Sequence, residues 1–376
     1  MREREERPVI VGASIAGALT ALHLARSGVS STVYDARTAP RAKVCGEGLH
    51  PSGRALIEDL IGDISELGFD LTGFEFFTPS GRLLGLDHPS KEVGLGCDRF
   101  LLDQRLWEEL ERSPEVDFIP GETVRGLERS RSGWFVRTTS GVVPTNRVVA
   151  ADGVGSRLRW STRRSRGRRH GRWGLRRRFQ GAARTPTRVQ IFFCGEGEIY
   201  VTPLAEGRVN VAVLGHEEFV RGLQDSERLS SFLEPVEVLR GAEPEDEISI
   251  LPHRGERSRV LCRDRLYMVG DAAIFLDPIS GAGMSVAACS AHIIGTHLAA
   301  VLAGACTDEE SEARAEKQLR SMIRPYRRMT RLLRLLSVSS TVRWGTTKFL
   351  KGAPKVLDRL ARPTHTAWAK EQVASI

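Results

Sequence analysis

The sequence lacks the features that mark a membrane-spanning or metal-bound protein. Its 376 residues contain no apolar run of about 18 to 20, the length that a spanning helix needs. Its six cysteines include no C-x-x-C pair, so we expect neither a disulfide framework nor a zinc site. This cysteine usage suits a reducing compartment, and we therefore expect a cytoplasmic protein.

Positive charge is in excess and unevenly placed. The net charge is +8, with arginine clusters between residues 157 and 178 and basic residues again between 320 and 355. Such clusters attract nucleic acid, anionic lipid or acidic substrates. We favour a solvated arginine-rich surface and expect no nucleic-acid partner, while peripheral contact with a membrane stays open. The chain length predicts two domains followed by a tail.

The N-terminal stretch has the pattern of a nucleotide-binding unit. An apolar run, Pro8–Val11, leads into Gly12, and an alanine- and leucine-rich helix is predicted over Ile15–Ala25. A second strand-like run, Thr32–Tyr34, ends at Asp35. This order is typical of dinucleotide binding, with a pyrophosphate at the helix N-terminus and a ribose at the carboxylate.

Two details bear on this interpretation. The middle glycine of the usual G-x-G-x-x-G is replaced by Ser14, whereas Gly17 keeps the small residue that lets the helix lie close to the strand. A buried strand–helix pair without a ligand is the alternative. A signal peptide is disfavoured because acidic residues precede the run and His23 interrupts it.

Two later strands end in the same manner. The run Arg147–Ala151 leads into Asp152-Gly153, and the run Leu266–Val269 leads into Gly270-Asp271. Ligands of α/β sheets bind at such carboxyl ends of strands. A long apolar helix is predicted over Met284–Leu302, after a turn rich in proline and glycine. Its N-terminal amides would face an electron-rich ring or a phosphate.

An arginine stands at an unfavourable place in another predicted helix. The helix begins at Asp98, whose side chain can cap it, and Leu102 and Leu106 share one face. Arg99 lies in the first turn, where the helix dipole disfavours a cation. An anionic or polar partner explains this arginine better than helix stability does; a solvent-facing side chain is the alternative.

Residues 171–255 differ in sequence pattern from the chain on either side. Short β-like runs such as Val189–Phe193, Ile199–Val201 and Val209–Leu214 alternate with turn residues. Together with a strand–turn–strand pattern at Phe74–Leu84, they predict a second, sheet-based domain. The tail carries apolar residues at helical spacing between arginines, which favours a helix that covers the core; an interfacial helix on an anionic membrane is the alternative.

Three strand-end motifs in this order are far more specific than any one alone. Gly12–Gly17 with Asp35, then Asp152-Gly153, then Gly270-Asp271 resemble the fingerprints of FAD-dependent hydroxylases of the para-hydroxybenzoate hydroxylase type, over residues 8–303. Geranylgeranyl reductases and flavin-dependent halogenases share that architecture. The resemblance implies an α/β fold with a Rossmann-like FAD-binding domain of the glutathione-reductase type, an inserted β-sheet substrate domain and a helical C-terminal tail.

The resemblance also implies domain limits and residue roles. The FAD-binding domain would comprise 1–72, 98–165 and 258–303, the β-rich substrate domain 73–97 and 166–257, and the basic helical C-terminal region 304–376. The implied cofactor-binding residues are Gly12, Ser14, Ile15 and Gly17 at the pyrophosphate, Asp35 at the adenosine ribose, Cys45, Gly46 and Gly48 beside the flavin, Arg99 and Asp152 as further FAD contacts, Val124 at the adenine, Asp271 at the ribityl or pyrophosphate region, and Gly281, Gly283 and Met284 along the isoalloxazine. The candidate catalytic residues are Cys45, Tyr200 and Pro278.

The reaction type is left between two main alternatives. The segment Lys43–Gly48 looks like the K-x-C-G-x-G loop of geranylgeranyl reductase-like proteins, in which Cys45 would be the acid of a C=C reduction; a packed small residue is its other interpretation. The reductase signature Y-x-W-x-F-P is reduced to Tyr200 and Pro203. Hydroxylases dominate the architecture, which favours a monooxygenase acting through a flavin C4a-hydroperoxide. A halogenase is disfavoured because the W-x-W-x-I-P tryptophan pair is absent.

Either reaction needs a hydride donor, which would be NAD(P)H or a partner reductase, although no second dinucleotide fingerprint is present. The expected substrate is a small or bulky hydrophobic organic molecule. Arg176–Arg178 would guide it if it were anionic or carrier-bound. The alternative to an enzyme is a non-catalytic flavoprotein. Such a protein would bind a membrane or nucleic acid through its arginine clusters.

Overall fold

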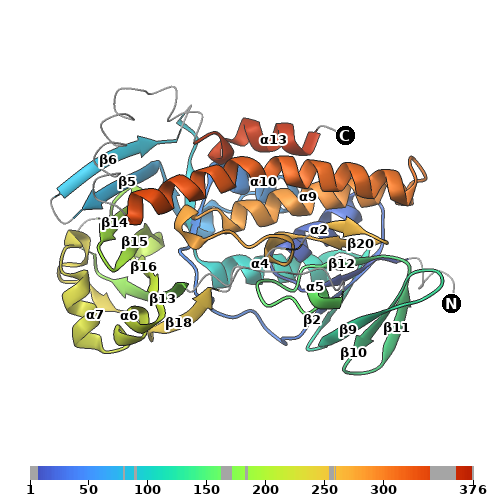
Figure 1. The fold of residues 1–376 in the computed structure, drawn as a ribbon, viewed down its shortest axis with the longest axis horizontal. Coiled ribbons are helices and arrows are strands. Elements are labelled where there is room, and N and C mark those ends of the chain that lie inside the picture. Colours follow the sequence, from blue (N-terminus) through green and yellow to red (C-terminus); the bar gives the residue numbers. More distant parts are fainter. Residues whose placement is uncertain are drawn as a thin grey trace.

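Two large sheets organise the molecule. The computed structural model describes residues 7–78, 81–88, 91–161, 172–182, 185–253, 258, 260–338 and 361–374. Figure 1 shows a parallel sheet toward one end of the molecule, a mainly antiparallel sheet toward the other, and the long helix α10 (Asp308–Val338) running along both. Two small three-stranded sheets complete the strand structure.

The parallel sheet brings the strand ends together. Its strand order is β19-β20-β12-β1-β2-β8, and only β19 at the edge runs antiparallel to its neighbour. Val11 stands opposite both Tyr34 and Ala150, and Ala150 stands opposite Met268. The residues that follow these strands therefore meet at one edge. The strands are β1 (Val9–Val11), β2 (Ser31–Asp35), β8 (Val116–Pro120), β12 (Val148–Ala150), β19 (Cys262–Arg263) and β20 (Leu266–Met268).

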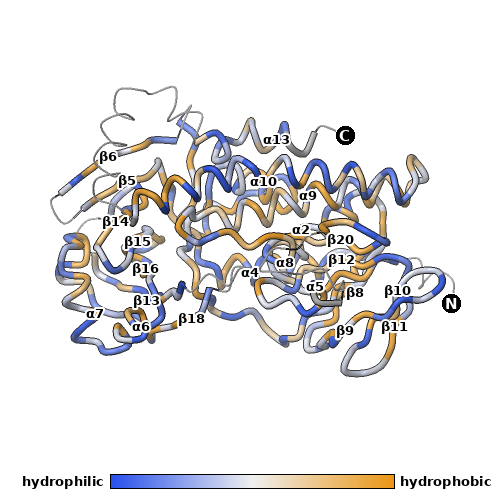
Figure 2. The backbone as a smooth tube through the Cα atoms, viewed as in Figure 1, coloured by the Kyte–Doolittle hydropathy of each residue, from blue (hydrophilic) through white to orange (hydrophobic). Residues whose placement is uncertain are grey.

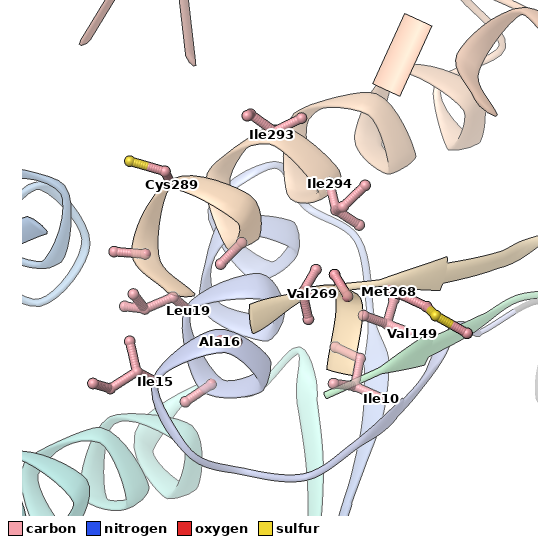
Figure 3. Close-up of a cluster of buried hydrophobic side chains, with 14 of the residues drawn as sticks. Ile10, Ile15, Ala16, Leu19, Val149, Met268, Val269, Cys289, Ile293 and Ile294 are labelled. Atoms are coloured by element: carbon pink, nitrogen blue, oxygen red, sulfur yellow. The ribbon is translucent and has the colours of Figure 1, made fainter. Parts of the chain in front are cut away.

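Helix α2 (Ile15–Arg26) packs between this sheet and α9 (Gly283–Leu302). Ile15 and Leu19 of α2, Cys289 of α9 and Val149 of the sheet all belong to the buried cluster of Figure 3. The remaining helices are α3 (Pro51–Ile61), α4 (Arg99–Arg112), α5 (Leu158–Ser161), α6 (Glu217–Gly222), α7 (Ser226–Leu233), α8 (Gly270–Ala273), α10 and α13 (Thr366–Ala374), with short 3-10 turns η1 (Ser65–Leu67), η3 (Ala205–Gly207), η4 (Glu237–Leu239), η5 (Pro278–Ser280) and η6 (Arg362–Thr364).

Helix α9 is long and apolar enough, by length and composition, to cross a membrane. In the structure, however, 72% of the most apolar 18-residue stretch of this helix is buried inside the fold. Its neighbours are α2, α3 and α10, which are helices of the same domain core. The helix therefore has the environment of a core helix.

The second large sheet separates two apolar clusters. Side chains alternate between its faces along each strand: Ile199 and Val201 join the cluster beneath α6 and α7, whereas Tyr200 joins the cluster that faces η5 and α10. Its path is β17-β13-β16-β15-β14-β5-β6, with β18 paired to β13 and only the β14–β5 pair parallel. The strands are β5 (Gly73–Thr78), β6 (Gly81–Asp87), β13 (Arg172–Gln180), β14 (Arg188–Cys194), β15 (Gly197–Pro203), β16 (Val209–His216), β17 (Glu243–Pro244) and β18 (Ser249–His253).

The small sheets flank these two layers. One joins β3 (Gly48–Leu49), β7 (Gly94–Cys97) and β4 (Gly68–Leu71), and the other joins β11 (Val142–Thr145), β10 (Trp134–Thr138) and β9 (Val124–Arg129). Figure 2 shows hydrophobic stretches along the buried strands and a mixture of hydrophobic and hydrophilic turns along α10. Met322, Ile323 and Tyr326 of α10 are buried, which confirms that this helix covers the core.

The observed architecture is the α/β fold expected from the sequence, with a Rossmann-like parallel sheet and an antiparallel second sheet. The boundaries between domains stay a prediction. The sequence also favours a strand over Gly121–Leu127, but β9 begins only at Val124, because Gly121 adopts a positive φ of 81° in the preceding turn. Arg163, Arg164, Arg168 and Arg169, and the basic residues at 339–360, lie outside the described residues.

Candidate cofactor and substrate site

One continuous cavity of about 1340 Å³ runs from the edge of the parallel sheet to the space beneath α10. It is larger than the roughly 300–1000 Å³ that a single drug-sized ligand fills, so it has room for a large cofactor and a second molecule. Every site residue predicted from the sequence lines it, with the exception of Gly17. The roles assigned to these residues stay predictions.

Gly12 and Gly17 set the close approach of α2 to the sheet. Gly12 has a φ of 104°, and a Cβ atom there would lie 2.5 Å from the Ala151 carbonyl oxygen. A Cβ atom on Gly17 would lie 1.8 Å from the Gly12 carbonyl oxygen, which is an impossible contact. Gly17 therefore serves helix packing behind the cavity wall and does not line the pyrophosphate position that the resemblance implied for it.

Two cations converge at the N-terminus of α2. Lys43 Nζ lies 2.6 Å and Arg99 Nη2 lies 3.2 Å from Ser14 Oγ, and both cations pair with Asp103. The first turn of α2 contains no acidic residue, and Ser14 makes no side-chain capping bond. Burial lowers the pKa of Lys43. The positive charge of Arg99 lowers this pKa further, whereas Asp103 raises it. A bound anion would offset the unfavourable free energy of burying these two cations side by side, so the position suits a pyrophosphate.

The anionic partner predicted for Arg99 is thus present. Arg99 is only 8% exposed, and its guanidinium contacts the carboxylate of Asp103 one helical turn later. The solvent-facing alternative is wrong. The predicted cap is confirmed as well, since Asp98 accepts a hydrogen bond from the Phe100 amide at 2.9 Å. The spacing of Arg99 and Asp103 by four residues indicates this pair in the sequence itself.

Three acidic residues stand at the strand ends. Asp35 accepts hydrogen bonds from the Ala13 amide at 2.8 Å and from the Arg37 amide at 3.0 Å. Asp152 accepts from the Arg157 amide through one oxygen, while its other oxygen is buried without a partner. Burial raises the pKa of Asp271 to about 6, although nearby cations oppose the shift. Buried acceptors with spare capacity call for hydroxyl donors, such as those of a ribose or ribityl chain.

The loop from Cys45 to Gly48 is fastened to the antiparallel sheet. Thr202 Oγ1 donates to the Gly46 carbonyl at 2.6 Å, and Asn210 Nδ2 donates to the Cys45 carbonyl at 2.9 Å. Glu47, which has a positive φ of 56° and is 1% exposed, forms an ion pair with Arg178. These three long-range contacts hold the loop along the cavity wall.

The candidate catalytic residues lie along the next part of the cavity. The Sγ atom of Cys45 accepts from the Glu47 amide at 3.4 Å and lies 3.8 Å from Arg99 Nη1. Pro278 opens the turn η5, after which Gly281 has a positive φ of 60°. The Tyr200 hydroxyl lies 3.5 Å from the Ile279 carbonyl oxygen. All three residues line the cavity, and Tyr200 and Pro278 are brought together at η5.

The arginines Arg176–Arg178 do not have the placement that guidance of a substrate requires. None of them lines the cavity. Arg176 is 2% exposed and pairs with Asp246 at 2.5 Å, while Arg178 pairs with Glu47 and Asp98. The expectation that this run guides an anionic substrate is therefore corrected: on β13 its buried members are neutralised by carboxylates.

Beyond Tyr200 the cavity becomes apolar, and we call this part the apolar chamber. The antiparallel sheet forms its floor and α10 its roof. Within it, His50 is buried, and neither of its ring nitrogens has a hydrogen-bond partner. Burial, with a smaller effect of His88, lowers the pKa of His50 to about 3, so the ring is neutral. No pattern in the sequence pointed to His50. The chamber is lined by His50, Leu71, Phe74, Phe76, Leu84, His88, Val189, Ile191, Phe193, Tyr200, Leu214, Ile279, Leu332, Leu333 and Leu336.

Solved flavoenzyme structures have the same fold. p-Nitrophenol 4-monooxygenase PnpA from Pseudomonas putida DLL-E4 superposes with a TM-score of 0.81, covering 98% of both chains at 18% identity. The flavin-dependent brominase Bmp2 gives 0.82, with 96% of this chain and 93% of Bmp2 covered at 16% identity. P. aeruginosa PqsL, in complex with 2-aminobenzoylacetate, gives 0.78, with 88% and 96% covered at 20% identity. At these identities the likeness shows the fold alone.

Sequence comparison adds the cofactor. A family model for an FAD binding domain matches residues 224–321, which include Gly270-Asp271 and α9. Kynurenine 3-monooxygenase of Salinispora arenicola is 29% identical over 180 residues, 42% of this chain and 38% of that protein. Digeranylgeranylglycerophospholipid reductase of Methanosphaerula palustris is 30% identical over 166 residues, 40% of either chain. The chain therefore contains an FAD binding domain, within a fold of the FAD-dependent monooxygenase type.

The residues of this flavoprotein fit FAD. Lys43, Arg99 and the N-terminus of α2 would hold the pyrophosphate, and the spare oxygen of Asp152 and the carboxylate of Asp271 offer acceptors for hydroxyl groups. A Cβ atom on Gly283 would meet nothing within 4 Å, and one on Gly281 would meet only His50 Nε2 at 3.7 Å, so a flat ring can lie against the backbone in front of α9. The matched segments span about two fifths of the length of both curated relatives.

Proposed function

We propose that this flavoprotein is a monooxygenase that oxygenates a hydrophobic, aromatic organic substrate. The observation that carries the proposal is the continuity of the nucleotide end of the cavity with the apolar chamber. When bound and reduced by NAD(P)H or a partner reductase, FAD supplies the electrons and activates the dioxygen for such a reaction. Support for an aromatic substrate comes from the fold relatives, since PnpA is a p-nitrophenol monooxygenase and PqsL was crystallised with 2-aminobenzoylacetate.

The protein's own contribution is to bind, orient and exclude water. Lys43 and Arg99 would neutralise the pyrophosphate, and the pair Glu47–Arg178 would keep the Cys45–Gly48 loop against the flavin ring. The side chains of Phe193 and Ile191 are 1% and 5% exposed, so the chamber walls hold back bulk solvent. A dry site protects reactive oxygen species from wasteful loss to water.

A C=C reductase is the second candidate. The sequence match to digeranylgeranylglycerophospholipid reductase and the place of Cys45 on the cavity wall favour it. In that reaction Cys45 would deliver a proton to the substrate carbon. A monooxygenase needs no proton from Cys45, so the effect of replacing Cys45 on activity distinguishes the two proposals.

The experiment uses the FAD-loaded protein, NADPH or NADH, oxygen-18 gas and 2-naphthol as the probe. We expect a hydroxylated product that contains one oxygen-18 atom, with about equal activity in Cys45→Ser. Loss of activity in Cys45→Ser together with anaerobic saturation of an isoprenoid double bond would overturn the proposal in favour of the reductase. Absence of label in a hydroxylated product, or no oxygenated product with either nicotinamide or with dithionite, would also overturn it.

A further inference from the structure

The charges that line the cavity are segregated. Its five lysine and arginine residues all lie at the nucleotide end: Arg37, Arg41, Lys43, Arg99 and Arg157. Two of these are at Ser14, and the others adjoin Asp35 or Asp152. Within the described part of the chain, no lysine or arginine lines the apolar chamber.

Two arginines beside Asp277, a residue of the cavity wall, are already paired with carboxylates. Arg172 forms ion pairs with Glu198 and with Asp277, the latter at 3.4 Å. Arg334 of α10 lies 3.6 Å from the second oxygen of Asp277. Two arginines thus face two carboxylates, and Asp277 is the member that reaches the cavity wall. A carboxylate in the chamber would be repelled by this acid on the adjoining cavity wall, and the described residues offer it no unpaired cation.

The polar groups inside the chamber are neutral hydrogen-bonding groups. Among the described residues, the two ring nitrogens of His50 have no hydrogen-bond partner, and the Tyr200 hydroxyl makes a long contact of 3.5 Å with the Ile279 carbonyl. Burial lowers the pKa of His50 to about 3 and that of His88 to about 4, so both rings are uncharged at neutral pH. A neutral imidazole presents one donor and one acceptor, which suits a hydroxyl or carbonyl group.

We infer that the apolar chamber selects an uncharged substrate, a mostly apolar aromatic compound with hydroxyl or carbonyl groups and without a carboxylate or phosphate. A buried anion without a counter-charge is strongly disfavoured. The inference rests on the proposed function, because it assigns the nucleotide end of the cavity to FAD. It also replaces the anionic substrate that the arginine run had suggested.

The test measures binding, so it does not depend on turnover. The FAD-loaded protein is titrated at neutral pH with 2-naphthol and with 2-naphthoate, which share one ring system and differ in charge, and flavin absorbance is followed. We expect 2-naphthol to bind at least roughly 100-fold more tightly than 2-naphthoate, because only the anion loses its hydration without gaining a partner. Equal or tighter binding of 2-naphthoate, or no binding of 2-naphthol, overturns the inference.

Two variants of α10 sharpen the test. Leu333 lines the chamber, so Leu333→Arg would place a cation at its roof and raise the affinity for 2-naphthoate relative to 2-naphthol about tenfold or more. Leu335 is 57% exposed on the same helix, and Leu335→Arg is the matched control that should leave the preference unchanged. An equal response to both variants would show that charge at the chamber does not set the preference. A preference for 2-naphthol without oxygen transfer would contradict the proposed function alone.

Discussion

Glu47 and Arg178 join the cavity loop to the antiparallel sheet through a buried ion pair, with 2.5 Å between Oε1 and Nη2. The two residues are 131 positions apart in the chain. Arg178 also contacts Asp98 at 2.8 Å, so one guanidinium holds the loop and the first turn of α4 together. The conformation of Glu47, with its positive φ, is thus maintained by a contact between distant segments.

Replacing Glu47 by alanine should loosen this junction. We expect Glu47→Ala to lower the free energy of unfolding by about 3 kcal/mol, the lower end of the range for breaking a buried pair, because Asp98 still neutralises Arg178. The affinity for FAD should fall as well, since the loop no longer lies against the ring position. Urea unfolding and FAD titration measure the two effects.

The matched control is Glu108→Ala on α4. Glu108 pairs with Arg112 at 3.1 Å on an exposed surface, and such pairs contribute about 0–1 kcal/mol. If both variants lose the same small amount of stability, the buried pair does not fasten the loop.

Lys43 should matter for cofactor binding more than for folding. Lys43→Gln removes one of the two cations at Ser14, and we expect the affinity of the protein for FAD to fall about tenfold or more, with a weaker dependence on salt. Lys317→Gln, on the exposed side of α10, is the control for a general loss of positive charge. FAD titrations at two ionic strengths measure the affinity and its dependence on salt. If Lys43→Gln and Lys317→Gln behaved alike, the assignment of Lys43 to cofactor binding would be wrong.

The nucleotide end of the site could be predicted from sequence because its signals are local. Gly12, Asp152 and Asp271 each lie just beyond the end of a short apolar strand, and the parallel register then brings the strand ends to one edge. The turn chemistry and the strand pattern are contained within a few residues in each case. Their agreement across three separate segments made the fold and the cofactor predictable.

The substrate end could not be predicted in the same way. The run Arg176–Arg178 has the composition of a solvated surface, and only the pairing of β13 with its neighbours places Asp246 and Glu47 beside it. His50 follows a glycine-rich loop without any motif of its own. Its isolation results from tertiary packing against Phe74, whose ring stands 5.6 Å away. Such burial depends on contacts between distant strands, which local patterns do not encode.

Gly17 gives a prediction about packing. Gly17→Ala would place a methyl group 1.8 Å from the Gly12 carbonyl oxygen, so α2 must move away from the sheet. We expect a loss of stability beyond the roughly 1–3 kcal/mol of ordinary overpacking, together with protein that is purified with little FAD. Thermal unfolding and the flavin-to-protein absorbance ratio measure both.

Gly126→Ala on β9 is the control for that experiment, because a Cβ atom there meets nothing within 4 Å. Its stability and FAD content should match those of the unaltered protein. Similar behaviour of the two variants would mean that α2 adjusts freely, and that the close approach at Gly17 is not needed for the cofactor site.

Asp271 gives a prediction with a definite pH dependence. Its pKa rises from an ordinary value of 3.8 to about 6 because the carboxyl is buried, so the folded protein without FAD binds a proton more tightly than the unfolded chain does. This group therefore reduces stability progressively as the pH rises from about 4 to above 6, and its effect is constant beyond that range. This group therefore gives the folded protein a pH-dependent loss of stability.

Asp271→Asn has no charge to bury, so it lacks this loss of stability. We expect the melting temperatures of the two FAD-free proteins to agree near pH 4 and the variant to be more stable at pH 7, with the difference developing across the interval between the two pKa values. With FAD bound, the advantage of the variant should shrink or reverse, because hydroxyl groups of the cofactor would donate to the ionised carboxylate. A difference in melting temperature that does not change with pH would refute the assignment of the buried charge to Asp271.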